Sequence, residues 1–301
     1  MFSMQKADTA VFDTLSARIT AGERLSPADV RELAATPDIL SLGMLADSLR
    51  RRLHGTRATF LRVAECTIDA PAIDPALASA QEVRITGTPD RLSDAVRAVE
   101  TLKASGDRTI AAFTWADVER MAAADGVPTV LARLRSAGLD GLAMLPLDGP
   151  VDIASAIDEL ASAGFTQLTL CVDKAPADAR VALLLRAGEL QDRFGCIQAI
   201  SPLPTTLAAF RPTTGYEDVK MVAIGRLAAP NVPSVQVDWR RYGPKLAQVA
   251  LTFGADDIDG VSGSNEAPEG RRRAPLEEIT RNIEAAGFEA IERSGRFTVL
   301  G

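Results

Sequence analysis

The sequence is poor in the side chains that most catalytic metal sites require. Its 301 residues contain one histidine, His54, which excludes mechanisms that need two imidazoles, the common zinc hydrolase sites among them. The three cysteines, Cys66, Cys171 and Cys196, are too few and too dispersed for a disulfide framework. No two of them are spaced as a zinc-binding pair. These absences remove several common enzyme classes.

Excess basic charge and long apolar runs are also lacking. The net charge of −7 argues against a broad basic surface for nucleic acid or anionic lipid, because phosphates are neutralised by clustered Lys and Arg. We explain the short basic runs at 50–52 and 271–273 as solvated faces. No apolar run approaches the ~20 residues that cross a bilayer, and the opening MFSMQKADTAVFDTL lacks the order of a signal peptide. We expect a cytoplasmic protein without nucleic-acid or membrane partners.

Strand-like apolar runs recur along the chain, and segments with helical periodicity separate most of them. A hydrophobic content of 47% is enough for a large core. In the helical segment at 90–105, Leu92, Val96, Val99 and Leu102 share one stripe. The strand-like runs occupy residues 57–63, 82–86, 108–113, 141–145, 167–172, 196–200, 234–239 and 256–260. Eight such alternations predict an α/β fold, a (β/α)8 TIM-type barrel, with a doubly wound open sheet as the alternative.

The chain ends suggest additions to this barrel. Residues 1–55 are predicted to form an N-terminal helical extension packed on the barrel, with two helices opened by Ser26-Pro27 and closed by Gly55. Residues 56–301 then form the barrel with a C-terminal extension. The polar, Gly- and Pro-rich segment 261–275 is predicted to be an exposed, mobile loop.

Four long, collinear blocks carry a family resemblance: residues 25–55, 111–142, 183–204 and 212–260. They resemble the radical S-adenosylmethionine (SAM) enzymes of futalosine-type menaquinone biosynthesis, most closely aminofutalosine synthase. Dehypoxanthine futalosine cyclase and the deazaflavin FO synthase are related to it. The resemblance implies the same radical-SAM barrel. It also implies a [4Fe–4S] cluster, held by a Cys-x-x-x-Cys-x-x-Cys loop after the first strand, and bound S-adenosylmethionine.

The corresponding loop of this sequence departs from that pattern. Residues 64–81 contain a single cysteine, Cys66, so the ligands that the family uses for the cluster are missing. The family's glycine-rich stretch after the fourth strand is replaced by Leu145, Pro146 and Leu147. Two further segments, at 171–176 and 261–270, lack the histidines that the resemblance implies. We therefore expect no cofactor and no metal.

The carboxyl ends of barrel strands supply the remaining candidates for a site. Arg62 and Arg240 are candidate anion anchors, and Asp238 or Asp256 could accept protons from ligand hydroxyls. The structural alternative is that these charges pair with one another or with helix N-termini. No catalytic acid–base pair is identified. The candidate ligand-binding residues are Arg62, Glu65, Thr114, Trp115, Asp173, Lys174, Asp238, Arg240, Asp256 and Asp259.

These observations predict a cluster-free, radical-SAM-like homologue of aminofutalosine synthase, that is, a pseudoenzyme of the futalosine pathway. Its expected role is that of a non-radical binding or partner protein. The expected partners are a small polar or nucleoside-like ligand and an active menaquinone-pathway enzyme. The alternative is an enzyme with non-radical acid/base or metal-assisted chemistry on a related small molecule at the carboxyl face of the barrel.

Overall fold

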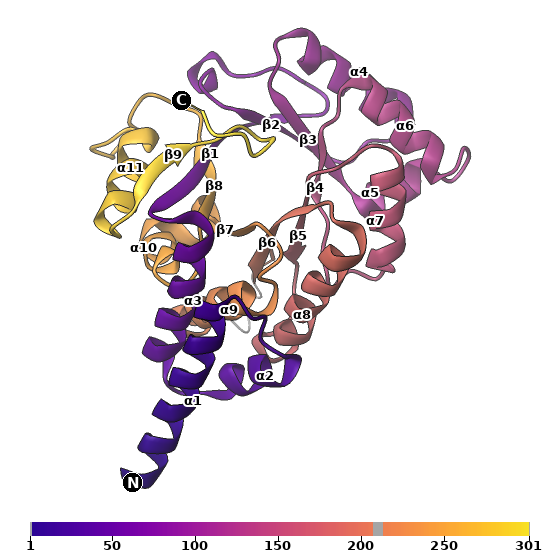
Figure 1. The fold of residues 1–301 in the computed structure, drawn as a ribbon. Helices are drawn as coiled ribbons and strands as arrows, with labels where there is room; N and C mark the ends of the chain where they lie inside the picture. The colour runs from indigo at the N-terminus through magenta and orange to yellow at the C-terminus, as the bar shows by residue number, and fades with distance from the viewer. Residues whose placement is uncertain (1, 207–212, 301) are drawn as a thin grey trace.

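Eight parallel strands form the centre of the molecule and confirm the predicted α/β barrel. The computed structural model describes residues 2–206 and 213–300. The sheet order is β4-β3-β2-β1-β8-β7-β6-β5, which brings β4 and β5 together and leaves the barrel nearly closed (Figure 1). The strands are β1 (Arg57–Thr67), β2 (Glu82–Thr86), β3 (Thr109–Thr114), β4 (Gly141–Met144), β5 (Leu168–Val172), β6 (Ile197–Pro204), β7 (Ser234–Asp238) and β8 (Asp257–Ser262).

Helices cover the outside of these strands (Figure 1). On α4, Leu92, Val99 and Leu102 are buried, as the stripe predicted. A short 3-10 helix, η1 (Pro75–Leu77), lies in the connection from β1 to β2. The covering helices are α4 (Leu92–Ala104), α5 (Trp115–Met121), α6 (Val127–Ala137), α7 (Ile153–Ser162), α8 (Ala177–Phe194), α9 (Gly215–Ala228), α10 (Trp239–Leu251) and α11 (Pro275–Ala285).

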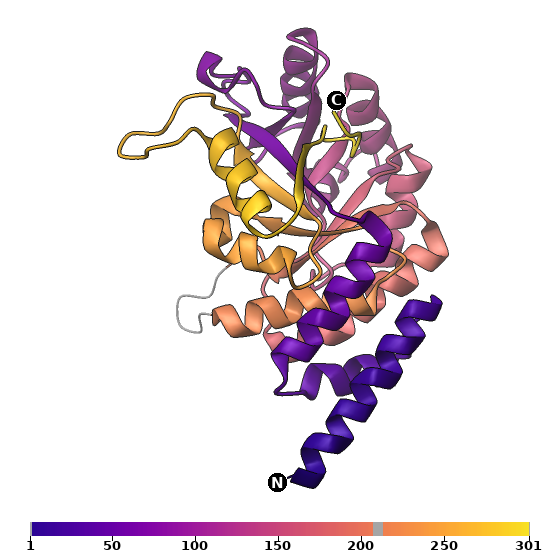
Figure 2. The same cartoon turned by 60° about the vertical axis from the view of Figure 1, so that its left-hand side comes forward.

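Three helices precede the barrel: α1 (Phe2–Ala21), α2 (Pro27–Ala35) and α3 (Ile39–His54). Ser26 starts α2 with a capping box, and Gly55 ends α3 at a φ of +62°, which only glycine adopts without strain. Helices α2 and α3 pack against α9, while α1 lies on α3 (Figure 2). No helix among the described residues is both long and apolar enough to span a bilayer.

Arg50 corrects the expectation that the run at 50–52 is a solvated face. Its side chain is fully buried and donates hydrogen bonds from three nitrogens to the backbone carbonyls of Gly55, Arg57 and Ala255. Burial lowers its pKa to about 10. Arg51 and Arg52 are exposed, as predicted. The first arginine of the run thus fastens α3 to the starts of β1 and β8.

The C-terminal segment closes the amino end of the barrel. Strand β9 (Glu289–Glu292) pairs with the first residues of β1, on the side where β2 has not yet begun. The chain then passes beneath β2 and β3. Gly295 lies so close to Glu82 and Thr109 that a Cβ atom there would meet their side chains at 2.5 and 2.6 Å. Before β9, the predicted loop is irregular, and its residues 265–273 are exposed.

The barrel's weakest junction is the β4–β5 seam, the facing edges of residues 141–147 and 168–172. Two backbone hydrogen bonds join these edges in the described structure, both at the carboxyl end. Leu147 N donates to Cys171 O at 2.8 Å, and Cys171 N donates to Leu145 O at 3.1 Å. The Asp148 carboxylate provides a further link, because it accepts hydrogen bonds from the backbone N–H groups of residues 173, 174 and 175, each at 2.7 Å. We call this set of three hydrogen bonds the Asp148 clasp. The amino half of the seam has no such links among the described residues.

Candidate functional site

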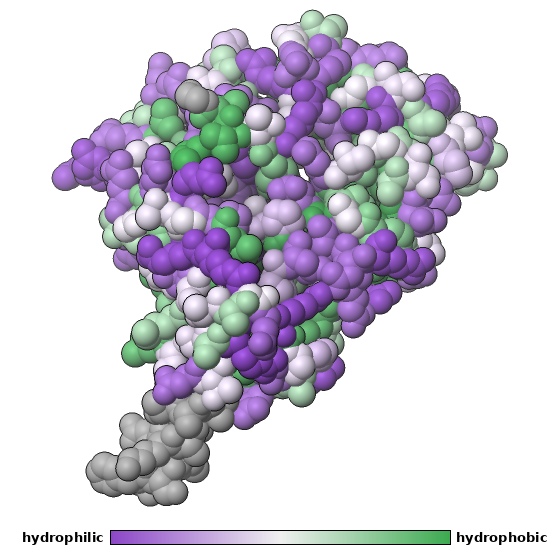
Figure 3. Space-filling view, in the orientation of Figure 1, coloured by the Kyte–Doolittle hydropathy of each residue, from purple (hydrophilic) through white to green (hydrophobic). Residues whose placement is uncertain are grey.

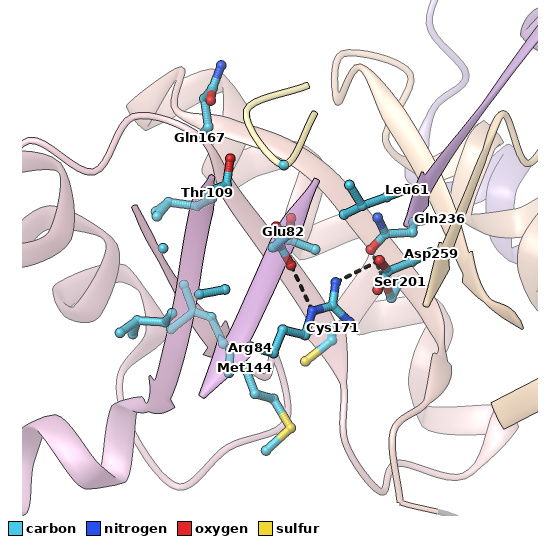
Figure 4. A pocket seen from close by; sticks show the side chains of 18 of the residues that line it. Leu61, Glu82, Arg84, Thr109, Met144, Gln167, Cys171, Ser201, Gln236 and Asp259 are labelled. Atoms are coloured by element: carbon cyan, nitrogen blue, oxygen red, sulfur yellow. Dashed lines mark hydrogen bonds and ion pairs between the residues drawn. The ribbon is translucent and has the colours of Figure 1, made fainter. Parts of the chain in front are cut away.

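The barrel interior holds a cavity of about 490 Å³, within the range of small-molecule sites. Barrel interiors are commonly filled by Val, Ile and Leu, but polar side chains line much of this one. Figure 4 shows Thr109 and Gln167 at one end of the cavity, and Met144 and Cys171 at the other. The polar lining within the barrel is Glu82, Arg84, Thr109, Thr169, Cys171, Ser201, Gln236, Asp238, Asp259 and Arg293.

Arg84 links two carboxylates across the cavity (Figure 4). Its Nε donates to Glu82 Oε1 and its Nη2 donates to Asp259 Oδ1, both at 2.7 Å. Strand alternation explains the arrangement, since Glu82 and Arg84 are two apart on β2 and face the same side. Asp259 comes from β8, on the far side of β1.

Arg293 forms a second, more deeply buried pair. It enters from the C-terminal segment, and its Nε and Nη2 donate to the two carboxylate oxygens of Asp257 at 2.6 and 2.7 Å. Asp257 also accepts hydrogen bonds from Gln236 Nε2 at 2.7 Å and from Thr59 Oγ1 at 2.6 Å. Ser201 donates to Gln236 at 3.2 Å. This network ties β1, β6, β7 and β8 to the tail of the chain.

The two carboxyls bound to Arg84 have pKa values shifted in opposite directions. Burial raises the pKa of Glu82, and the nearby Asp259 raises it further, against the attraction of Arg84. Burial alone would raise the pKa of Asp259 too, but the charge and hydrogen bond of Arg84 outweigh it and lower that pKa. Asp259 therefore carries the negative charge of this group, and Glu82 is the carboxyl more easily protonated.

This difference predicts the pH dependence of a Glu82→Gln variant. The raised pKa means that the folded state holds the Glu82 proton more tightly than the unfolded chain does. The free energy of unfolding of the parent protein therefore decreases as pH rises from the ordinary glutamate pKa, about 4.3, through the pKa of Glu82 in the folded state. We expect Glu82→Gln to gain free energy of unfolding relative to the parent over that window. Urea unfolding from pH 4 to 8 measures the difference, and Glu269→Gln, in the exposed loop, controls for the lost charge. A difference that does not change with pH would contradict the assignment.

Most of the predicted site residues lie outside this cavity, and only Asp238 and Asp259 line it. Arg62 is expected to bind an anionic ligand, but its side chain instead forms hydrogen bonds within the protein. Its Nε and Nη2 donate to the Glu292 carboxylate at 2.8 and 3.0 Å, and its Nη1 donates to Asn265 Oδ1 at 2.9 Å. Because these partners occupy all three nitrogens, the geometry corrects the role expected for Arg62.

Asp256 was expected at the carboxyl end of a strand but lies at the opposite end. It directly precedes β8, where it accepts Val235 N at 2.8 Å and pairs with the buried Arg226. His54, also on this side, contacts Pro233 O at 3.0 Å, and burial lowers its pKa. Asp256 therefore cannot serve a ligand at the carboxyl face.

The remaining predicted residues do lie at the carboxyl face, in pairs. Glu65 and Arg240 form an ion pair with each other there. Asp173 accepts hydrogen bonds from the hydroxyls of Thr205 and Thr206 at 2.9 and 2.6 Å, which together with Lys174 lower its pKa against the effect of burial. The Lys174 side chain is 71% exposed. These contacts agree with the structural alternative that strand-end charges pair locally.

Thr114 and Trp115 begin α5. Thr114 caps this helix through a capping box with Asp117, which fully accounts for its hydroxyl. Trp115 is buried, and its indole Nε1 has no hydrogen-bond partner. Asp238, which does line the cavity, caps α10 by accepting Arg241 N at 3.0 Å.

The charged residues inside the barrel were not predicted from the sequence, because only residues at strand ends were considered as candidates for the site. The alternation of Glu82, Val83, Arg84 and Ile85 was a usable signal, since a strand buried on both faces is usually apolar throughout. The role of Arg293 had no local signal. Its partner Asp257 lies 36 residues away, and only the path of the C-terminal segment brings them together.

Comparisons with known proteins agree with this fold. The FeFe-hydrogenase maturase HydG from Carboxydothermus hydrogenoformans matches 97% of this chain and 82% of its own, with a TM-score of 0.69 and 12% identity. Methylornithine synthase matches 92% of this chain and 97% of its own, with a TM-score of 0.65 and 14% identity. At such identities these likenesses concern the fold alone. They define the class as a (β/α)8 barrel.

Sequence comparisons narrow that class. The CofH/MqnC C-terminal region model matches residues 203–300. An aminodeoxyfutalosine synthase from Streptomyces coelicolor is 32% identical over 142 residues, 40% of this chain and 37% of that protein. The Thermus thermophilus aminodeoxyfutalosine synthase is 25% identical over 94% of both chains. A 5-amino-6-(D-ribitylamino)uracil--L-tyrosine 4-hydroxyphenyl transferase from Archaeoglobus fulgidus is 32% identical over 40% of this chain and 39% of its own. The chain is therefore similar to these enzymes, and it matches less than half of the length of the Streptomyces and Archaeoglobus proteins.

The cysteines of the chain do not fit the iron–sulfur cluster that the resemblance to radical-SAM enzymes implies. Cys171 lines the cavity near the carboxyl end of β5, whereas Cys66, near the end of β1, belongs to the hydrophobic core. Cys196 precedes β6, at the amino end of the barrel. Burial raises the pKa of all three thiols, that of Cys171 to about 12, which disfavours the thiolate that iron needs. The three sulfurs therefore do not form one metal site.

Proposed function

We propose that this chain is a member of the radical-SAM family of menaquinone and cofactor biosynthesis that works without radical chemistry and binds a small polar molecule inside its barrel. The observation that carries the proposal is the placement of the three cysteines: Cys66 and Cys171 lie on two different strands, and Cys196 precedes a third at the opposite end of the barrel. The interior cavity with its polar lining supports a binding role. A nucleoside-like or ribityl-bearing ligand is supported by the names of the relatives, one an aminodeoxyfutalosine synthase and one acting on a ribitylamino-uracil.

The same proposal places the protein beside an active enzyme of menaquinone biosynthesis, in the cytoplasm. Its support is the similarity to aminodeoxyfutalosine synthases together with a well-packed core around the cavity. Core defects cost several kcal/mol each against a total stability of about 5–15 kcal/mol, so an unused chain would not keep such packing for long. Co-purification with tagged pathway enzymes tests the association, and failure to bind any of them would remove this part of the proposal.

An interior carboxyl favours one second candidate, acid/base catalysis in the cavity. Glu82 faces the cavity, and burial raises its pKa, which favours the protonated form that a general acid needs. The candidate predicts turnover of a bound pathway metabolite that Glu82→Gln abolishes while ligand binding persists. Binding without turnover supports the first proposal instead.

Iron analysis provides the direct test of the cluster-free proposal. After anaerobic reconstitution with iron and sulfide, we expect far less than one cluster per chain and no cleavage of S-adenosylmethionine. The reason is that the described residues include no group of three or more His, Cys, Asp or Glu side chains that could hold a metal ion. A cluster-binding relative carried through the same procedure is the positive control. Cys171→Ser is expected to leave the iron content unchanged. About four irons per chain, lost in Cys171→Ser, would overturn the proposal.

A further inference from the structure

The β4–β5 seam is open on one side only. At its carboxyl end, two backbone hydrogen bonds and the Asp148 clasp hold the strands together. Buried Leu145 and Leu147 fill the space beside them. At its amino end, no backbone hydrogen bond crosses between 141–143 and 168–170 in the described part of the chain. Strand edges left in this way keep unpaired N–H and C=O groups, which require water or a ligand.

The cavity reaches solvent at this open half. Ala143, Thr166 and Gln167 are exposed and also line the cavity. The space-filling view shows a hollow in the face where Figure 1 places β4 and the C-terminal segment (Figure 3). The carboxyl face, in contrast, is crossed by the Glu65–Arg240 pair and by the hydrogen bond from the Tyr242 hydroxyl to Pro204 O at 2.8 Å. The seam therefore offers a lateral route to the interior.

Each charged side chain that lines the cavity already has a partner of opposite charge. Inside, Arg84 pairs with Glu82 and Asp259, and Arg293 pairs with Asp257. Near the opening, Arg135 and Arg296 both approach Asp140, at 3.5 and 3.3 Å. Arg241 approaches Asp238 at 3.4 Å. Inside the barrel, an ionic ligand would have to displace one of the buried partners, and breaking a buried pair costs about 3–5 kcal/mol.

Neutral groups at the open half are the ones still available. The hydroxyls of Thr109 and Thr169 and the amide of Gln167 line the cavity, and none of them is engaged by another described residue. Leu142 and Phe297 add apolar surface to the lining. Such a wall suits a molecule with hydroxyl or amide groups on one side and an uncharged ring on the other.

We infer that the β4–β5 seam is the entry to a binding site for an electrically neutral, hydroxyl- and amide-bearing small molecule, held in the amino half of the barrel. The inference rests on the proposed binding function and adds to it the ligand's charge and its route. The site differs in position from the carboxyl face, where the sequence placed its candidates. Entry through a side seam is possible because barrel closure there depends on links at one end only.

The charge requirement is tested with a matched pair of probes, inosine and inosine 5′-monophosphate, on the full chain. Thermal shift and calorimetry should show inosine bound at least tenfold more tightly than its phosphate. Tighter binding of the phosphate would overturn the neutral-ligand inference while leaving a cluster-free binding protein in place. No binding of either probe at millimolar concentration would overturn the inference as well. The iron content, which tests the proposed function, is measured separately from the binding of the two probes, so failure of this inference and failure of the proposed function can be distinguished.

The route is tested by filling the seam. Ala143→Trp and Gln167→Trp, both at exposed positions, should slow inosine association at least tenfold in surface plasmon resonance. Lys174→Trp, at the exposed carboxyl face, is the matched control and should leave the rate unchanged. Circular dichroism verifies that each variant is folded. Equal association rates in all three variants, or slowing only in Lys174→Trp, would overturn the lateral route.

Discussion

Replacing Arg293 by Met is expected to lower the free energy of unfolding by about 3–5 kcal/mol, because it leaves the Asp257 carboxylate buried without its cation. Asp257 is fully buried, and its two oxygens accept both guanidinium hydrogen bonds. The same change removes the residue that anchors the C-terminal segment in the barrel interior. Urea unfolding at pH 7 measures the loss.

Arg296→Met is the matched control, since it lies three residues away and its ion pairs are partly exposed. Exposed pairs contribute about 0–1 kcal/mol, so this variant should remain near the parent. The double variant Asp257→Asn, Arg293→Met should recover part of the loss, because it removes the uncompensated charge as well. Similar small losses in both single variants would show that the buried pair does not hold the segment in place.

Asp148→Ala is expected to release the carboxyl end of the β4–β5 seam and to cost about 2–3 kcal/mol. Its carboxylate accepts three neighbouring backbone N–H groups, at 173, 174 and 175, and hydrogen bonds to a charged group are the stronger kind. Hydrogen exchange of these three amides should accelerate at least tenfold. The amides within β1 and β8 should keep their protection unless the whole barrel opens.

The control for this variant is Asp152→Ala, which removes the N-terminal cap of α7 four residues along the chain. Loss of a cap costs about 1 kcal/mol and should leave exchange at 173–175 unchanged. Asp148→Asn should fall between the parent and Asp148→Ala, because its amide oxygen still accepts. If Asp148→Ala and Asp152→Ala gave the same exchange pattern, the clasp would have no special role at the seam.

The local pattern of apolar residues was sufficient to predict the barrel strands and the helices between them. Strand β1 was expected at 57–63 and extends to Thr67, while β2 was placed at its observed bounds. Short-range signals decide such elements: apolar runs, capping residues and glycines with positive φ. Strand β9 was missed, because a four-residue strand of mixed polarity becomes stable only beside β1.

The candidate site was less predictable, and Asp256 and Asp259 show why. Asp256 precedes β8 and faces the amino end, whereas Asp259, three residues later, points into the cavity. A boundary error of one or two residues at a strand moves a side chain to another end or another face of the sheet. Arg62 illustrates a second cause of error, since its partner Glu292 lies 230 residues away and no local sequence pattern indicates that the two are in contact.

The sequence by itself determined the alternation of strands and helices and the scarcity of thiols and imidazoles, because composition and periodicity are local properties. Tertiary structure alone decided that Arg84 and Arg293 neutralise the carboxylates inside the barrel, and that β4 and β5 are joined at only one end. Those features depend on contacts between segments far apart in the chain. Their geometry is set by barrel closure and by the path of the C-terminal segment beneath β2 and β3.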